Sequence, residues 1–289
     1  MNPVSLLFTG LIVNPIVTLV AGIYYVLTLL HVPSPLGFSI ILLTIAIRLI
    51  LYPFTGAQLK TARKMQKLTP HLNSLKAKHK DDAKTLQAET MKLYKEHGVN
   101  PAAGCLPLLV QLPIIWGLYY VLQQIVNANS KLVVTFVNHA VYISAFQIHH
   151  AWDSHFFGLP LGQTPSHLLS SLGIVVFLVP LLTAAFQFIQ SKMMAPALEK
   201  KLAEVEKDAK KEKNKALVKE VKKEDDFMTA FQTQSLFLFP LMIGFFSWSL
   251  PVGLSFYWNT FTIFGIIQQY SISGLGGIED WIQKIRKPL

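Results

Sequence analysis

The chain has 289 residues, of which 52% are hydrophobic and only 15% are charged, and its formal net charge is +10 at pH 7. This composition, with a mean hydropathy of +0.40, excludes an ordinary soluble domain and is typical of a protein with several membrane spans. The single cysteine, Cys105, excludes a disulfide framework.

Residues 1–34 are apolar but begin without a lysine or arginine, which argues against a cleaved signal peptide. Asn14 and Pro15 interrupt the apolar run, and Pro15 suits the first turn of a helix. We expect an N-terminal interfacial helix that lies in the outer membrane interface. A sixth membrane span is the alternative.

Five later segments are apolar over about 20 residues, the length that crosses a bilayer as a helix. The sequence therefore predicts an all-α polytopic membrane protein with five transmembrane helices. These are residues 35–58, 102–126, 168–190, 234–250 and 252–273.

The basic residues orient these spans. Of the 26 Lys and Arg residues, 24 lie in three segments, residues 59–101, 191–233 and the short tail 274–289. The loop at 127–167 contains only Lys131. Because cytoplasmic loops carry the excess of Lys and Arg, we expect those three segments in the cytoplasm, the loop outside, and an N-out, C-in topology.

The first cytoplasmic segment, residues 59–101, has apolar residues three and four positions apart on both sides of the polar stretch 79–82. This periodicity predicts a cytoplasmic helical hairpin, in which each helix packs one apolar stripe against the other. A merely solvated basic linker is the alternative. The second segment, 191–233, is a charged cytoplasmic loop in which we expect exposed helix and no site.

The exoplasmic loop 127–167 contains five of the nine histidines. Asp153 is the only carboxylate there, no cysteine is near, and the spacing fits no familiar ligand pattern. We therefore expect no metal and no other cofactor. The chain also has no Ser/His/Asp order, no HExxH and no Gly-rich phosphate loop, so an enzyme is not expected.

Arg48 is the most informative residue because it lies in a predicted span that contains no acidic residue. A charge at mid-bilayer costs about 2.5–3.5 kcal/mol on insertion scales and is by default a functional-site hypothesis. Arg48 lies nine residues before Ala57, hence about 14 Å deep in a straight helix, too far for easy snorkelling.

Other polar residues share the predicted spans with Arg48. Gln111 lies at a similar predicted depth, and an Arg and a Gln at one level without an acid indicate a hydrated cavity open to the cytoplasm. Single polar residues that only join helices are the alternative. The candidate groove residues are Arg48, Thr44, Gln111, Gln187, Gln190, Tyr257 and Trp258.

Several motifs occur in an order that resembles the YidC/Oxa1/Alb3 membrane protein insertase family. They are IRLILYPFTGAQLKTARKMQKLTP, MKLYKEHGVNPAAGCLPLLVQLPIIWGLYYVL, FFGLPLG, FIQSKMM and VGLSFYWNTFTIFGIIQQY. The resemblance implies five helices around a hydrophilic groove, with Arg48 as the groove arginine. It also implies that Gln190 and Trp258 lie on the groove side and that the hairpin contacts substrates and targeting factors.

The chain resembles bacterial YidC without the large periplasmic domain of Gram-negative members, and no transit peptide is evident, so we expect a bacterial plasma membrane location. We expect an insertase that needs no nucleotide. Its partners would be nascent membrane proteins and lipid, with the ribosome, signal recognition components and the Sec translocon as candidates, and without a dedicated nucleic acid site. Two other functions stay open: an anion-selective channel or transporter that uses Arg48, and a chaperone that only accompanies Sec.

Overall fold

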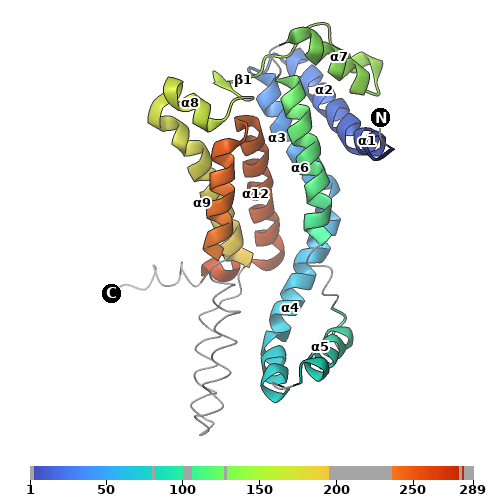
Figure 1. The fold of residues 1–289 in the computed structure, drawn as a ribbon, viewed down its shortest axis with the longest axis vertical. Helices are drawn as coiled ribbons and strands as arrows, with labels where there is room; N and C mark the ends of the chain where they lie inside the picture. The colour runs from blue at the N-terminus through green and yellow to red at the C-terminus, as the bar shows by residue number, and fades with distance from the viewer. Residues whose placement is uncertain are drawn as a thin grey trace. The chain divides into compact units, whose positions relative to one another are not determined.

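The computed structural model describes residues 3–79, 82–99, 106–126, 129–194, 236–279 and 282, and these residues are mostly helical (Figure 1). The chain forms two compact units, each built from three separate segments. The first unit comprises Met1–Tyr52, Leu108–Phe186 and Leu241–Phe264, and the second comprises Pro53–Pro107, Gln187–Pro240 and Gly265–Leu289.

The N-terminal run is helical from α1 (Pro3–Phe8) through a π-helical turn (Thr9–Val13) into α2 (Asn14–Leu29). The expected break at Asn14 and Pro15 is instead a widening of the helix, in which the Asn14 N–H bonds to the carbonyl of Thr9. Pro15 has no N–H to donate to the preceding turn, which accounts for the local departure from α-helical geometry.

The predicted first span, 35–58, is not one helix. Helix α3 (Pro35–Ile50) ends before Leu51, and α4 (Tyr52–Lys78) begins directly after it. Pro53 explains the interruption, because its ring would clash with the carbonyl four residues earlier in a continuous helix. The straight helix to Ala57, from which the depth of Arg48 was predicted, is therefore not present.

The core of the first unit forms where α2, α3 and three later helices meet. Helix α2 packs against α3 and against α7 (Ser130–Ala140). Helices α6 (Leu106–Ile125) and α12 (Val252–Ser273) add further buried residues. Fully buried members of this core include Val17, Ile40, Leu43, Leu122, Leu161, Leu254 and Tyr257.

The exoplasmic loop of the prediction is an ordered part of the first unit. Besides α7 it contains a 3₁₀ turn (Ser144–Phe146) and a hairpin of β1 (His155–Phe156) and β2 (Leu159–Pro160). The ring of Phe156 packs so closely on α3 that a Cβ atom on Gly37 would overlap it. Glycine at position 37 is therefore required for this contact.

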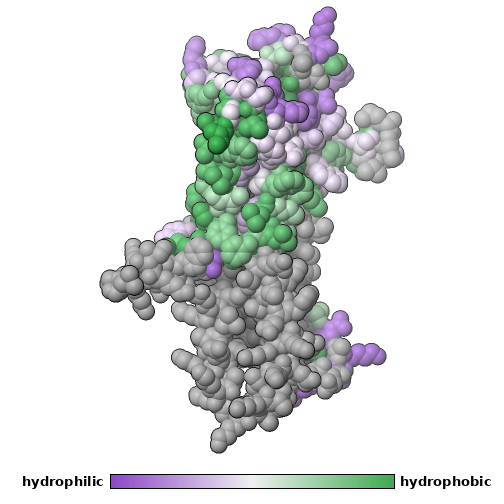
Figure 2. All heavy atoms as spheres, turned by 60° about the vertical axis from the view of Figure 1, so that its left-hand side comes forward, coloured by the Kyte–Doolittle hydropathy of each residue, from purple (hydrophilic) through white to green (hydrophobic). Residues whose placement is uncertain are grey.

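The third predicted span begins as α8 (Pro165–Leu172), continues as a 3₁₀ turn (Gly173–Phe177) and ends as α9 (Leu178–Met194). The helix Leu236–Ser249 follows in the described chain. Its Trp248 stacks on Phe177 with ring centroids 4.6 Å apart. Apolar side chains cover much of the face shown in Figure 2. In α9 and the helix Leu236–Ser249, the exposed apolar side chains include Leu181, Leu241 and Phe245.

In the second unit, α4 and α5 (Ala83–Glu96) lie on either side of the polar stretch 79–82. The imidazole rings of His71 and His97 stack 6.3 Å apart, which brings the end of α5 back beside the last third of α4. Asp82 caps α5 by accepting the Thr85 N–H at 3.0 Å. Most of the predicted charged loop 191–233 lies outside the described residues.

Two helices in the described part of the chain are long and apolar enough to cross a membrane, Ser5–Leu29 with 25 residues and Pro165–Met194 with 30. A third is added if Pro35–Ile50 and Tyr52–Thr61 are taken as one broken span. The protein is thus a mostly helical membrane protein. The length of Ser5–Leu29 suits the alternative of a sixth span as well as an interfacial helix.

Candidate functional site

Arg48 lies near the end of α3 with only 5% of its surface exposed. Its Nη2 donates a hydrogen bond of 2.6 Å to the backbone carbonyl of Phe261 on α12. Its guanidinium carbon also lies 3.4 Å from the centroid of the Phe261 ring and 6.0 Å from that of Phe264. A cation over an aromatic face is attracted by the ring quadrupole, and more strongly when both are desolvated.

The charge of Arg48 is not neutralised by a carboxylate within the described residues, where the only contact between a basic and an acidic side chain joins His155 and Asp153. The Nε atom of Arg48 is buried and has no hydrogen-bond partner in this part of the chain. A buried cation normally requires a partner for its charge and for each N–H group. The Arg48 guanidinium therefore retains capacity for one further acceptor, preferably an anionic one.

Gln111 and Tyr257 join α6 to α12. The side-chain amide of Gln111 donates to the hydroxyl of Tyr257, which is 1% exposed. Tyr257 and Phe261 are one helical turn apart on α12, with ring centroids 5.9 Å apart. Arg48 and Gln111, which lie on different helices, thus contact adjacent turns of α12.

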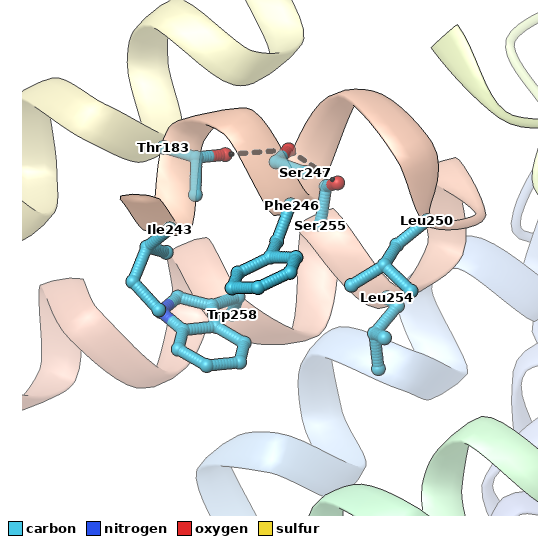
Figure 3. Close-up of a pocket in the computed structure, with 8 residues that line it drawn as sticks. All are labelled: Thr183, Ile243, Phe246, Ser247, Leu250, Leu254, Ser255 and Trp258. Carbon is cyan, nitrogen blue, oxygen red and sulfur yellow. Dashed lines mark hydrogen bonds between the residues drawn. The ribbon is translucent and has the colours of Figure 1, made fainter. Parts of the chain in front are cut away.

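Thr44 and Trp258 lie in different surroundings. Thr44 lies one turn before Arg48, is fully buried, and donates its hydroxyl to the Ile40 carbonyl of its own helix at 2.7 Å. Trp258 lines a cavity of about 90 Å³ among α9, the helix Leu236–Ser249 and the start of α12 (Figure 3). Gln187 and Gln190, on α9, belong to the second unit.

The cavity contains polar groups that the sequence analysis did not select. Thr183, Ser247 and Ser255 line it and form a chain of hydroxyls (Figure 3). The Thr183–Ser247 and Ser247–Ser255 oxygen distances are 3.3 Å and 2.9 Å. Serine and threonine are common in membrane helices, so the positions of these three in the sequence do not indicate that their hydroxyls meet. Only the packing of the helices shows it.

Phe261 was also missed, because an aromatic residue in a span is ordinarily a packing residue. Its distance from Arg48 in sequence, a separation of 213 residues, gives no local signal. The histidines of the outer loop do not gather: among the described residues no group of three or more His, Cys, Asp or Glu could hold a metal ion. His155 instead bonds to Asp153 at 2.8 Å, which lowers the pKa of that carboxyl group.

Long apolar helices, together with a buried arginine that no carboxylate of the described residues neutralises, define the class: a helical membrane protein with a polar site inside it. Residues 28–276 match the family described as 60Kd inner membrane protein. The chain belongs to this family, the YidC/Oxa1/Alb3 insertases, as the motifs predicted. Its members are membrane protein insertases and not enzymes.

Individual relatives agree with this membership. "Membrane protein insertase YidC" of Fusobacterium nucleatum is 32% identical over 240 residues, which are 83% of this chain and 87% of that protein. "Inner membrane protein ALBINO3, chloroplastic" of Arabidopsis thaliana is 32% identical over 256 residues, 87% of this chain and 49% of the relative. A YidC of Nitratidesulfovibrio vulgaris is 29% identical over 264 residues, 91% of this chain and 38% of the relative. The chain thus spans about half or less of the last two proteins.

Proposed function

We propose that the chain takes nascent membrane proteins into a hydrophilic groove open to the cytoplasm and releases their transmembrane segments into lipid. The observation that carries this proposal is Arg48. Among the described residues it is 5% exposed, lacks an acidic partner, and keeps an unpartnered Nε. A fixed, desolvated cation attracts a carboxylate more strongly than an exposed cation does in water.

The proposed mechanism has two steps. First, acidic residues in the outer segment of a client bind near Arg48, so that this segment moves partway across the bilayer. Bare hydrocarbon would impose a cost of several kcal/mol for each unsatisfied polar group, and polar side chains near Arg48 such as Gln111 reduce it. Second, the apolar span of the client moves into lipid, and its burial provides about 25 cal/mol per Å².

The proposal includes an arrangement in the membrane. Five transmembrane helices surround the groove, the N-terminus is outside and the C-terminus is in the cytoplasm of a bacterial plasma membrane. The groove residues are Arg48, Thr44, Gln111, Gln187, Gln190, Tyr257 and Trp258. Single cysteines in a Cys105→Ser background test the topology: a probe that does not cross membranes should label position 131 only from outside and position 84 only from inside.

The decisive experiment measures protease-protected insertion of a single-span client with an acidic outer tail into liposomes that contain only this protein. Wild type is compared with Arg48→Ala, Arg48→Lys and Lys131→Ala. Lys131→Ala is the matched control, because it also removes one positive charge but from the start of α7. We expect insertion by wild type, Lys131→Ala and, to a lesser degree, Arg48→Lys, with loss in Arg48→Ala.

Other outcomes of this experiment would contradict the proposed role of Arg48 or favour a different function. Equal insertion by wild type and Arg48→Ala would reduce Arg48 to a structural residue. Anion flux that depends on Arg48, without insertion, would favour the channel. Insertion only after the Sec translocon is added would indicate an assembly chaperone, and the same assay with ribosomes or signal recognition components tests the remaining candidate partners.

A further inference from the structure

The cavity beside Trp258 presents a chain of three hydroxyls whose hydrogen bonds can be followed from one to the next. The Thr183 hydroxyl donates to the carbonyl of Val179 at 2.9 Å, and a carbonyl can only accept. Its proton is therefore used, so the 3.3 Å contact with Ser247 requires Ser247 as the donor. Ser247 then has no proton left for its 2.9 Å contact with Ser255, and Ser255 must donate there.

This order of donors leaves the row of three hydroxyls with a free acceptor at one end and with no free donor. All three hydroxyl protons are used, whereas the oxygen of Ser255 receives no hydrogen bond from the described residues. Ser255 is only 4% exposed and lines the cavity. A buried hydroxyl oxygen with both lone pairs unfilled is a site for a hydrogen-bond donor.

The surroundings limit the size and charge of that donor. The cavity measures about 90 Å³ and is otherwise lined by the apolar or aromatic side chains of Ile243, Phe246, Leu250, Leu254 and Trp258. Cavities of roughly 150 Å³ accept benzene, so this one suits a group of a few heavy atoms. An ammonium group would need a counter-ion, and the residues that line the cavity include no acid.

The cavity also differs from the Arg48 site in position and in preference. Ser255 and Tyr257 are two residues apart on α12, so their side chains point to widely different sides of that helix. Tyr257 belongs to the side that meets Gln111, and Phe261, one turn on, meets Arg48. On one side of α12, Arg48 of α3 thus offers a donor to an anion, whereas on another side Ser255 of α12 offers an acceptor to a neutral donor.

We propose that this cavity is a subsite for a serine or threonine side chain carried by the transmembrane segment of a client. The proposal rests on the proposed insertase function and names a class of client that the arginine does not recognise. A threonine methyl group would contact the apolar wall while its hydroxyl donates to Ser255. The cavity is partly open, and its wall residue Phe246 is 49% exposed, so an incoming helix can reach this wall of the cavity.

The test uses pairs of single-span clients that differ only by threonine or valine, which have the same shape, at each position along the span in turn. Insertion rates are measured in liposomes with wild type, Ser255→Ala and Ser249→Ala. Ser249 is exposed at the end of the helix Leu236–Ser249 and serves as the matched control. At one register we expect Ser255→Ala to lower the threonine-to-valine rate ratio about fivefold, and Ser249→Ala to leave it unchanged.

The rate ratio cancels any general loss of folded protein, because both clients meet the same variant. A second measurement does not depend on activity: Ser255→Cys in a Cys105→Ser background should form a disulfide with a cysteine at that same client register under copper phenanthroline. An unchanged threonine-to-valine ratio at every client position, or cross-linking at no client position, overturns the proposed subsite. If the wild type still inserts clients in that case, the proposed insertase function is not contradicted. Failure of wild type to insert either client overturns the proposed function itself.

Discussion

The guanidinium of Arg48 is bound by two different parts of one residue, Phe261. The backbone carbonyl of Phe261 accepts a 2.6 Å hydrogen bond, and the ring lies 3.4 Å from the guanidinium carbon. The carbonyl fixes the position of one nitrogen, and the ring packs against the guanidinium carbon. This arrangement holds a buried cation in a defined orientation without a counter-charge from the described residues.

The first prediction concerns this ring. Phe261→Leu keeps the carbonyl but removes the quadrupole, worth about 0.5–2 kcal/mol to a nearby cation. We expect insertion of a client with an acidic tail to fall roughly 2- to 30-fold, as measured by protease protection. Phe264→Leu is the matched control and should have a smaller effect, since its ring lies 6.0 Å away. Equal effects would show that both residues act only through packing.

The second prediction concerns the bond between Gln111 and Tyr257. Gln111→Leu and Tyr257→Phe should each lower the stability of the protein, and the double variant should lose less than the sum. We expect a coupling free energy of about 0.5–1.5 kcal/mol, measured by unfolding in detergent. Strict additivity of the two losses would mean that the hydrogen bond contributes nothing.

The third prediction tests the contact of Gly37 with Phe156. A Cβ atom at position 37 would overlap the ring, so Gly37→Ala should destabilise the first unit by about 1–3 kcal/mol through overpacking. Thermal unfolding in detergent measures this loss, and adding Phe156→Leu should restore part of it. Gly10→Ala is the control, because a Cβ atom at position 10 would meet no described atom within 4 Å. Comparable losses in both variants would refute the steric explanation.

The fourth prediction concerns pH and the start of α5. Hydrogen bonds from the side chain and backbone of Thr85 hold the pKa of the Asp82 carboxyl below its usual value. A carboxyl group with a lowered folded pKa stabilises the fold above its unfolded pKa, about 3.9, and this stabilisation is lost as the pH falls through the folded pKa. Amide exchange in α5, corrected for intrinsic rates, should therefore lose protection at acidic pH.

Asp82→Asn is the control for this titration, because asparagine also caps helices but does not ionise. Its α5 amides should show the same protection throughout the acidic range. A wild-type profile that matches the Asp82→Asn profile would exclude the carboxylate as the cause.

The helical membrane class could be predicted from the sequence because it depends on composition and charge, which need no knowledge of neighbours. The same signals selected Arg48, whose functional role stays a prediction. The break at Leu51 was not predicted, although Pro53 is a local signal for one. No helix or strand was predicted within the outer loop, yet α7 and the β1–β2 hairpin give it a packed structure. The strands β1 and β2 have only two residues each, too few for periodicity to identify.

Among the site residues, too, those that stand out by residue type were selected, whereas their contacts were not predicted. Gln111 and Tyr257 were each selected as polar residues in apolar surroundings, but their mutual bond joins positions 146 residues apart. The hydroxyls of Thr183, Ser247 and Ser255 were not selected, since each alone resembles ordinary helix-joining serine or threonine. Which helices are neighbours decides both cases, and the local pattern of residue types along the chain does not reveal it.

The Nε of Arg48, which has no partner in the described part of the chain, has a kinetic consequence. Nη2 is already bound to the Phe261 carbonyl, so the guanidinium does not swing freely, while Nε has no such bond that must first break. A client carboxylate would therefore bind to Nε without first displacing another hydrogen-bond partner. Release would likewise leave the arginine in the orientation it had before. A residue held in this way can accept successive clients without resetting its own conformation.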